Sequence, residues 1–193
     1  MHLAAGFFRV IVCLSFLTLA PSAMALEMGG GYSRQLLNNT AIEQYEMVVR
    51  QPLAYKAELS GWSDQTKRMP LRMVFGGELR ISSVVEMAMA VIREADTAHP
   101  AVGKFTIMPQ LVLRPHNRLH WFFGLGAGLM GGDTAFTEHD LGGNFFLASK
   151  IGTRLLLGDN WGSELVYYHQ SNGGIYDHNA SLNMCQFALF YRF

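Results

Sequence analysis

Long hydrophobic runs are missing after the first 25 residues: no later stretch has the ~18 consecutive apolar residues of a membrane-spanning helix. Cysteine is scarce, with only Cys13 and Cys185, and neither sign of charge predominates, because 15 Lys and Arg residues balance 15 Asp and Glu residues. These shortages argue against a helical membrane protein and, since no basic stripe is present, against a nucleic-acid partner. They also leave no second cysteine for an intramolecular disulfide once Cys13 is removed.

The first 25 residues have the pattern of a secretory signal peptide. A single charge at Arg9 precedes an apolar run over 10–20, and the small-x-small sequence AMA at 23–25 is typical of a signal peptidase site. The apolar run is too short to span a bilayer comfortably. We therefore expect residues 1–25 to be a signal peptide and residues 26–193 to form a single exported domain.

Alternation of apolar and polar residues with a period of two runs through the rest of the chain, as in β-strands. Near the C-terminus, for example, Phe187 and Leu189 share one face, whereas Gln186 and Arg192 share the other. The pattern occurs in eight segments: 27–37, 43–56, 71–92, 104–114, 118–130, 141–157, 161–172 and 182–193. An even number of such segments predicts an all-β fold, an eight-stranded antiparallel up-and-down β-barrel.

The connections between these segments favour the same topology. Residues 115–117 (PHN) and 158–160 (GDN) have the composition of tight turns, whereas the connections after the third, fifth and seventh segments are longer. Short turns at one end and longer loops at the other are typical of outer-membrane barrels. Residues 57–70 depart from this pattern and are predicted to be a long connection on the turn side.

Alternation alone does not say whether the apolar face meets lipid or encloses a ligand, as in a soluble lipocalin. Charged residues that can compensate one another share the other face: Glu78, Arg80, Glu86, Arg114, Lys150, Arg154 and Glu164. Aromatic residues of the apolar face fall near strand ends, where membrane barrels have aromatic girdles: Trp121, Trp161, Tyr167 and Tyr191. Both features favour a polar lumen and a lipid-facing outer wall.

The C-terminus favours the same location. The chain stops at an aromatic residue, Phe193, after alternating hydrophobic residues, a pattern that resembles the recognition signal of outer-membrane assembly. We therefore expect a multi-pass β-barrel in the cell outer membrane. The alternative, a periplasmic ligand-binding barrel, predicts a protein that is soluble without detergent.

A polar cluster interrupts the apolar face near the end of the seventh segment. His169 and Ser171 are two residues apart and share the lipid-facing parity, so their side chains can reach each other. Residues 172–174 (NGG) follow and can present backbone N–H groups to an oxyanion. A hydroxyl beside a histidine base is the arrangement of nucleophilic acyl transfer. Asn183, on the facing segment, has the parity to orient the His169 ring. The alternative is that His169 and Ser171 have no function and lie at the level of the lipid headgroups, where polar side chains cost little free energy.

The stretch from Asn160 to Phe193, NWGSELVYYHQSNGGIYDHNASLNMCQFALFYRF, resembles the C-terminal part of the lipid A 3-O-deacylase (PagL) family. The resemblance covers roughly residues 104–193. It implies an outer-membrane enzyme, without metal or cofactor, whose active site on the outer wall hydrolyses the ester-linked acyl chain at position 3 of lipid A in lipopolysaccharide. It also implies the residue roles: Ser171 as nucleophile, His169 as base, and Asn172 and Gly174 in the oxyanion hole.

One position departs from the family pattern, because Asn183 stands where the family has a glutamate. An amide can hold a histidine tautomer but cannot offset the charge of the imidazolium. Asp177 is another candidate for the acid. The alternative function is a catalytically degenerate small barrel with a structural or surface-interaction role.

Two further questions stay open from the sequence. Loop residues with carboxylate and imidazole groups are candidate cation ligands, although solvated loop residues are the simpler interpretation: Glu138, His139, Asp140, Asp177 and His178. The oligomeric state is also open, and a homodimer is one option.

Overall fold

The computed structural model describes residues 26–37, 41–59, 79–95, 97–137 and 139–193. The predicted signal peptide, residues 1–25, lies outside the described residues, as do Glu78 and the first part of the strand predicted over 71–92. No helix among the described residues is long and apolar enough to cross a bilayer.

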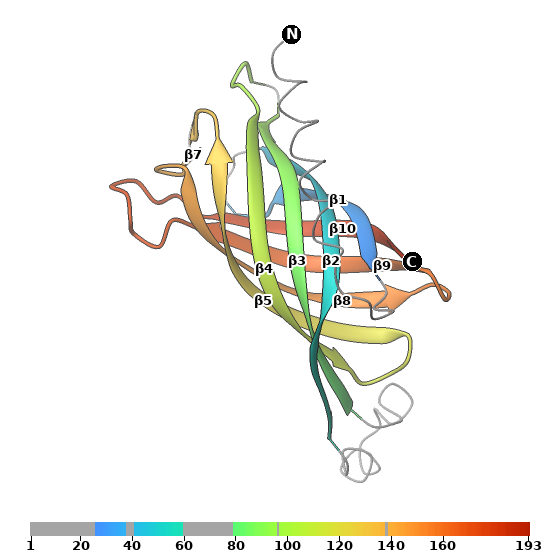
Figure 1. Ribbon diagram of the computed structural model, residues 1–193. Helices are drawn as coiled ribbons and strands as arrows, with labels where there is room; N and C mark the ends of the chain where they lie inside the picture. The colour runs from blue at the N-terminus through green and yellow to red at the C-terminus, as the bar shows by residue number, and fades with distance from the viewer. Residues whose placement is uncertain (1–25, 38–40, 60–78, 96, 138) are drawn as a thin grey trace.

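Eight antiparallel strands form a closed barrel (Figure 1). They are β1 (Glu27–Gln35), β2 (Ile42–Leu59), β3 (Leu79–Glu94), β4 (Val102–Arg114), β5 (Leu119–Gly131), β8 (Phe145–Leu156), β9 (Trp161–Ser171) and β10 (Leu182–Arg192). Each strand pairs with the next along the barrel, and β1 closes the sheet against β10. The predicted eight-stranded up-and-down barrel is confirmed.

The two ends of the barrel differ as predicted. The turn end carries the connections 115–118 and 157–160, and there the Phe193 N–H donates to the Leu26 carbonyl at 2.9 Å. The loop end carries the connection between β9 and β10, together with a small hairpin of β6 (Ala135–Phe136) and β7 (His139–Asp140). Alternation did not predict this hairpin, because two-residue strands are too short to alternate. Strands β2 and β3 extend beyond their neighbours at the turn end (Figure 1).

Side chains alternate between the lumen and the outer wall. In β4, Lys104 is buried in the lumen, whereas Phe105 and Ile107 are exposed on the outer wall. Even-numbered residues face inward in the other strands too, but β1 has the opposite parity, with Ser33 buried and Arg34 exposed. The apolar face is therefore the outer one, as a membrane barrel requires and a ligand-enclosing barrel does not.

A network of ion pairs fills the middle of the lumen. The Arg50 guanidinium donates to Glu86 and to Glu164, each at 2.7 Å. Arg154 in turn donates to Glu164 at 2.6 Å and to Glu27 at 3.0 Å. Charges that cross the lumen in this way tie strands that are distant in the sequence to one another.

Lys150 extends the network, because its ammonium group donates to Glu46 at 2.5 Å and to Glu86 at 2.7 Å. Four of the charges predicted to lie inside are buried here: Glu86, Lys150, Arg154 and Glu164. Arg80 is paired with Arg114, but it lies close to the turn end of β3, where its side chain is exposed rather than buried. Arg114, the last residue of β4, is half-buried.

Apolar side chains fill the lumen towards the loop end. The largest of them are Met108, Met130, Phe136, Phe146, Tyr168 and Met184. Gly128 faces the Phe146 ring, and a Cβ at this position would overlap it. The barrel is thus a packed core rather than a pore along the length that carries the candidate site.

Replacement of Arg50 by methionine should lower the free energy of unfolding by about 3–5 kcal/mol, because Glu86 and Glu164 lose a buried partner. The measurement is a denaturant titration in detergent micelles, followed by tryptophan fluorescence. Arg118→Met, in an exposed turn, is the matched control and should change the free energy by less than about 0.5 kcal/mol. Equal losses in the two variants would contradict a structural role for the network.

Candidate active site

The strand register brings the predicted catalytic residues together on the outer wall. His169 in β9 is paired with Asn183 in β10, so the hypothesis that these two residues face each other is confirmed. On its other side, His169 is paired with Ser149 in β8. The three residues form a row across three strands, and all are half-buried.

Hydrogen bonds fix the orientation of the His169 ring. The Nδ1 atom of His169 lies 2.9 Å from Asn183 Oδ1. Because an amide oxygen only accepts hydrogen bonds, Nδ1 must carry the proton, and Nε2 is then left with a lone pair. This is the tautomer that a general base needs.

The Asn183 amide is itself held by two neighbours. Tyr167 donates its hydroxyl to Asn183 Oδ1 at 2.7 Å, and Asn183 Nδ2 donates to Ser181 Oγ at 3.3 Å. Reasoning from the sequence missed the parts of Tyr167 and Ser181 in this cluster. Strand parity was the available signal for Tyr167, which shares the outward face with His169. Ser181 precedes β10, where parity gives no signal.

Ser171 is the last residue of β9 and lies two residues beyond His169 on the same face. Their α-carbons are therefore ~6.7 Å apart. Although both residues are described, the structure gives no hydrogen bond between the Ser171 hydroxyl and the His169 ring. Such contacts are often long in unliganded enzymes and shorten when substrate binds.

The residues after Ser171 form a tight turn. The Ile175 N–H donates to the Asn172 carbonyl at 3.3 Å, and Gly173 and Gly174 have φ angles of 66° and 79°. Two central residues with positive φ are what a type I′ turn requires, and glycine adopts them without strain. The two glycines thus give this turn its shape.

Asn172 is buried and holds the loop together. Its Nδ2 group donates to the Leu141 and His178 carbonyls, and its own N–H donates to Asn179 Oδ1 at 3.0 Å. Gly142, at φ 81°, lies against these groups, and a Cβ there would overlap the His178 carbonyl. The amide group of the Asn172 side chain is therefore already hydrogen-bonded within the loops.

The Gly174 N–H is also engaged, because it donates to Asn172 Oδ1 at 2.8 Å. Neither Asn172 nor Gly174 directs a free donor at the outer wall in this arrangement. The predicted oxyanion role of the two residues would require these hydrogen bonds to open. The Gly173 N–H, two residues from Ser171, has no acceptor among the described residues.

The candidate cation ligands in the loops have other partners. His139 Nε2 lies 2.8 Å from the Ser181 carbonyl, and Asp140 accepts the Gly142 N–H at 2.8 Å. Within the described ranges, which leave out Glu138, no group of three or more His, Cys, Asp or Glu residues is placed to hold a metal ion. Asp177 is exposed in the loop and is not part of the His169 cluster.

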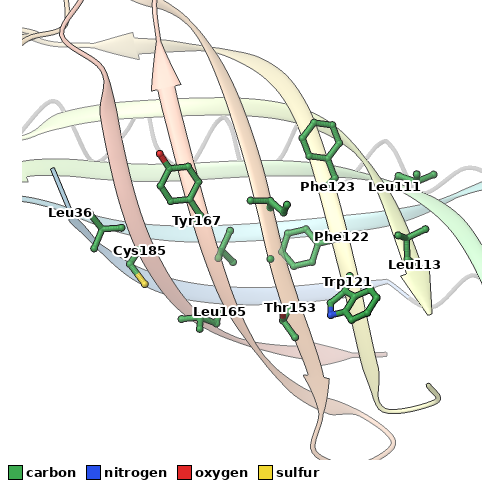
Figure 2. Close-up of a pocket in the computed structure, with 13 residues that line it drawn as sticks. Leu36, Leu111, Leu113, Trp121, Phe122, Phe123, Thr153, Leu165, Tyr167 and Cys185 are labelled. Atoms are coloured by element: carbon green, nitrogen blue, oxygen red, sulfur yellow. The ribbon is translucent and has the colours of Figure 1, made fainter. Parts of the chain in front are cut away.

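An apolar groove of about 610 Å³ adjoins this cluster on the outer wall (Figure 2). Tyr167 and Cys185, one step below His169 and Asn183 along their strands, line it on one side together with Leu36. Other lining side chains come from β4, β5 and β8: Leu111, Leu113, Trp121, Phe123 and Ile151. The groove has the chemistry of an acyl-chain site.

The family model described as "Lipid A 3-O-deacylase (PagL)" matches residues 55–192. The chain belongs to this family. It is therefore an outer-membrane β-barrel, as its apolar outer wall indicates. The PagL family also accounts for the resemblance around His169 and Ser171. No curated protein matches the chain in sequence.

Solved structures share the fold at low sequence identity. The outer membrane enzyme PagL is 14% identical with a TM-score of 0.60, over 86% of this chain and 97% of that chain. The Yersinia pestis outer membrane protein Ail in a bilayer nanodisc is 12% identical with a TM-score of 0.49, over 88% and 99%. Neisserial surface protein A is 9% identical with a TM-score of 0.47, over 89% and 98%.

The His169 tautomer gives a direct test of this hydrogen-bond geometry in the PagL-family barrel. At a pH where the ring is neutral, ¹⁵N NMR should show His169 with its proton on Nδ1, and Asn183→Leu should release this preference because the acceptor is lost. His116, whose Nδ1 accepts the Arg118 N–H at 3.1 Å, is the internal control and should keep its proton on Nε2 in both proteins. A His169 signal unchanged by Asn183→Leu would contradict the geometry.

Proposed function

We propose that this protein hydrolyses the ester-linked acyl chain at position 3 of lipid A in the outer membrane. The observation that carries the proposal is the His169 ring, held by Asn183 in the Nδ1–H form on the lipid-facing wall, two residues from Ser171. Family membership and the adjoining groove support it. No metal or cofactor takes part.

The proposed reaction is a two-step acyl transfer. His169 Nε2 accepts the Ser171 hydroxyl proton as Oγ attacks the ester carbonyl carbon. The imidazolium then returns this proton to the departing sugar oxygen, which leaves an acyl-serine and a free sugar hydroxyl. Water, deprotonated by His169, attacks the acyl-serine, and Ser171 regains its proton as the fatty acid leaves.

The surrounding residues have separate roles in this proposal. Asn183 accepts the Nδ1–H bond throughout, while the oxyanion is stabilised by amides of the turn. We assign this to Asn172 and Gly174 once their loop hydrogen bonds open, together with the Gly173 N–H. The acyl chain lies in the groove beside Tyr167, where apolar side chains match its chemistry.

Ser171→Ala should abolish deacylation, because the nucleophile is lost. The measurement is mass spectrometry of lipid A from cells that make the wild type or the variant, where only the wild type should remove one 3-hydroxyacyl group. Ser149→Ala is the matched control, since Ser149 also lies beside His169 on the outer wall but has no part in the proposed reaction.

The contrasting outcomes separate the alternatives. Loss of activity in Ser149→Ala with retention in Ser171→Ala would move the nucleophile to β8. Intact lipid A with the wild type, both in cells and with purified protein in detergent, would favour the catalytically degenerate barrel.

Asn183→Glu should raise turnover. A carboxylate would accept the same Nδ1–H bond and would also offset the imidazolium charge, and a charged acceptor adds about 1–2 kcal/mol over a neutral one. If this acts in the transition state, kcat rises roughly 5- to 30-fold. The measurement is the initial rate of fatty acid release in detergent micelles, with Asn183→Gln as the uncharged control. An unchanged or lower rate would remove Asn183 from the mechanism.

A further inference from the structure

Charged side chains on the outer wall gather at one place. The outward faces of β4, β5, β8, β9 and β10, all of whose residues are described, carry none. At the loop end of β1, β2 and β3, in contrast, Arg34, Glu43 and Arg93 project outward. These three residues, with Tyr32 and Tyr45, are called the charged cluster below.

The charged cluster is organised around the Glu43 carboxylate. Arg93 donates to Glu43 at 2.7 Å, and Tyr32 donates to the same carboxylate at 3.0 Å. The Arg93 guanidinium also lies over the Tyr45 ring, 5.3 Å from its centre. The Glu43 carboxylate therefore accepts hydrogen bonds from Arg93 and Tyr32, which hold it in place beside Arg34.

Arg34 is the cation of the charged cluster that takes no part in the Glu43–Arg93 ion pair. It is exposed, and its guanidinium has no hydrogen bond or ion pair among the described residues. Its cross-strand neighbour Glu43 already carries the Arg93 guanidinium. Two arginines thus face one carboxylate, and the charged cluster has a net positive charge.

The charged cluster adjoins the candidate active site. Arg34 is paired with Cys185 in β10, two residues from Asn183, and the Leu36 N–H donates to the Asn183 carbonyl at 2.7 Å. With ~6.7 Å between alternate residues and ~4.8 Å between strands, the Arg34 and Asn183 α-carbons are roughly 8 Å apart. An arginine side chain spans most of that separation.

Placing a cation on a lipid-facing wall costs much free energy in the hydrocarbon region. The cost is small only near the interface, where an anion can pair with the cation. Lipid A is a phosphorylated glucosamine disaccharide, and the guanidinium fork matches a phosphate group in shape and charge. We propose that Arg34, supported by the Glu43–Arg93 pair, binds the glycosidic phosphate of the glycolipid substrate. This inference rests on the proposed function, because it takes lipid A as the substrate.

The phosphate contact gives Arg34 a positioning role. Anchoring the sugar beside β10 brings one ester towards Ser171 while its acyl chain enters the groove, which Cys185 lines next to Arg34. The contact therefore selects which ester is presented, and it acts through substrate binding rather than through the chemical step. Arg34 should affect KM more than kcat.

The test compares diphosphoryl lipid A with the monophosphoryl form that lacks the glycosidic phosphate, in detergent micelles. Arg34→Gln should raise the KM for the diphosphoryl substrate roughly tenfold with little change in kcat, and Arg34→Lys should restore part of the loss. The same substitution should have little effect on the monophosphoryl substrate. Arg118→Gln, an exposed arginine at the turn end, is the control and should behave as the wild type.

Two outcomes would overturn the inference: an equal loss on both substrates, or no loss on either. Direct binding separates it from the proposed function. Diphosphoryl lipid A should bind to the Ser171→Ala variant. The double variant Ser171→Ala/Arg34→Gln should bind it with roughly tenfold lower affinity, whether or not the wild type hydrolyses the lipid. The second binding experiment uses inorganic phosphate in place of the lipid. If it binds as tightly as the lipid and this binding depends on Arg34, the site is one for free anions instead.

Discussion

The fold depends on where charge can be placed. Lipid cannot satisfy an ionised side chain, so a strand that spans the membrane must turn its charges inward and pair them there. Arg50, Arg154 and Lys150 do this with four carboxylates that come from β1, β2, β3 and β9. The network allows an outer wall that is almost entirely apolar, and the few polar groups on that wall then stand out.

Among the described residues, the charged groups on the outer wall and the His169–Asn183 pair lie at the loop end, on neighbouring strands. β9 and β10 carry His169 and Asn183, while β1, β2 and β3 carry the charged cluster. Polar groups here lie near the level of lipid headgroups, where their cost is small and a glycolipid presents its esters and phosphates. In the proposed function, substrate therefore reaches the site sideways within the membrane, and the packed lumen only holds the strands in place.

In the proposed mechanism, the Asn183 amide takes the place of a carboxylate in part. Its oxygen receives both the His169 Nδ1–H and the Tyr167 hydroxyl, while its nitrogen is held by Ser181. The tautomer of the histidine is thereby fixed, which is the geometric part of the task. The electrostatic part, stabilisation of the imidazolium, is what an amide supplies least well.

The sequence by itself determined the strand rhythm, the tight turns and the face shared by His169, Ser171 and Asn183, because alternation and turn composition are local properties. Only the tertiary structure decided the register that sets His169 against Asn183, the reversed parity of β1 and the exposure of Arg80. The tertiary structure also decided that the Asn172 side chain makes its hydrogen bonds within the loops. These features depend on which residues meet across strands and loops, and closure of the barrel fixes those partners through contacts that a period of two does not encode.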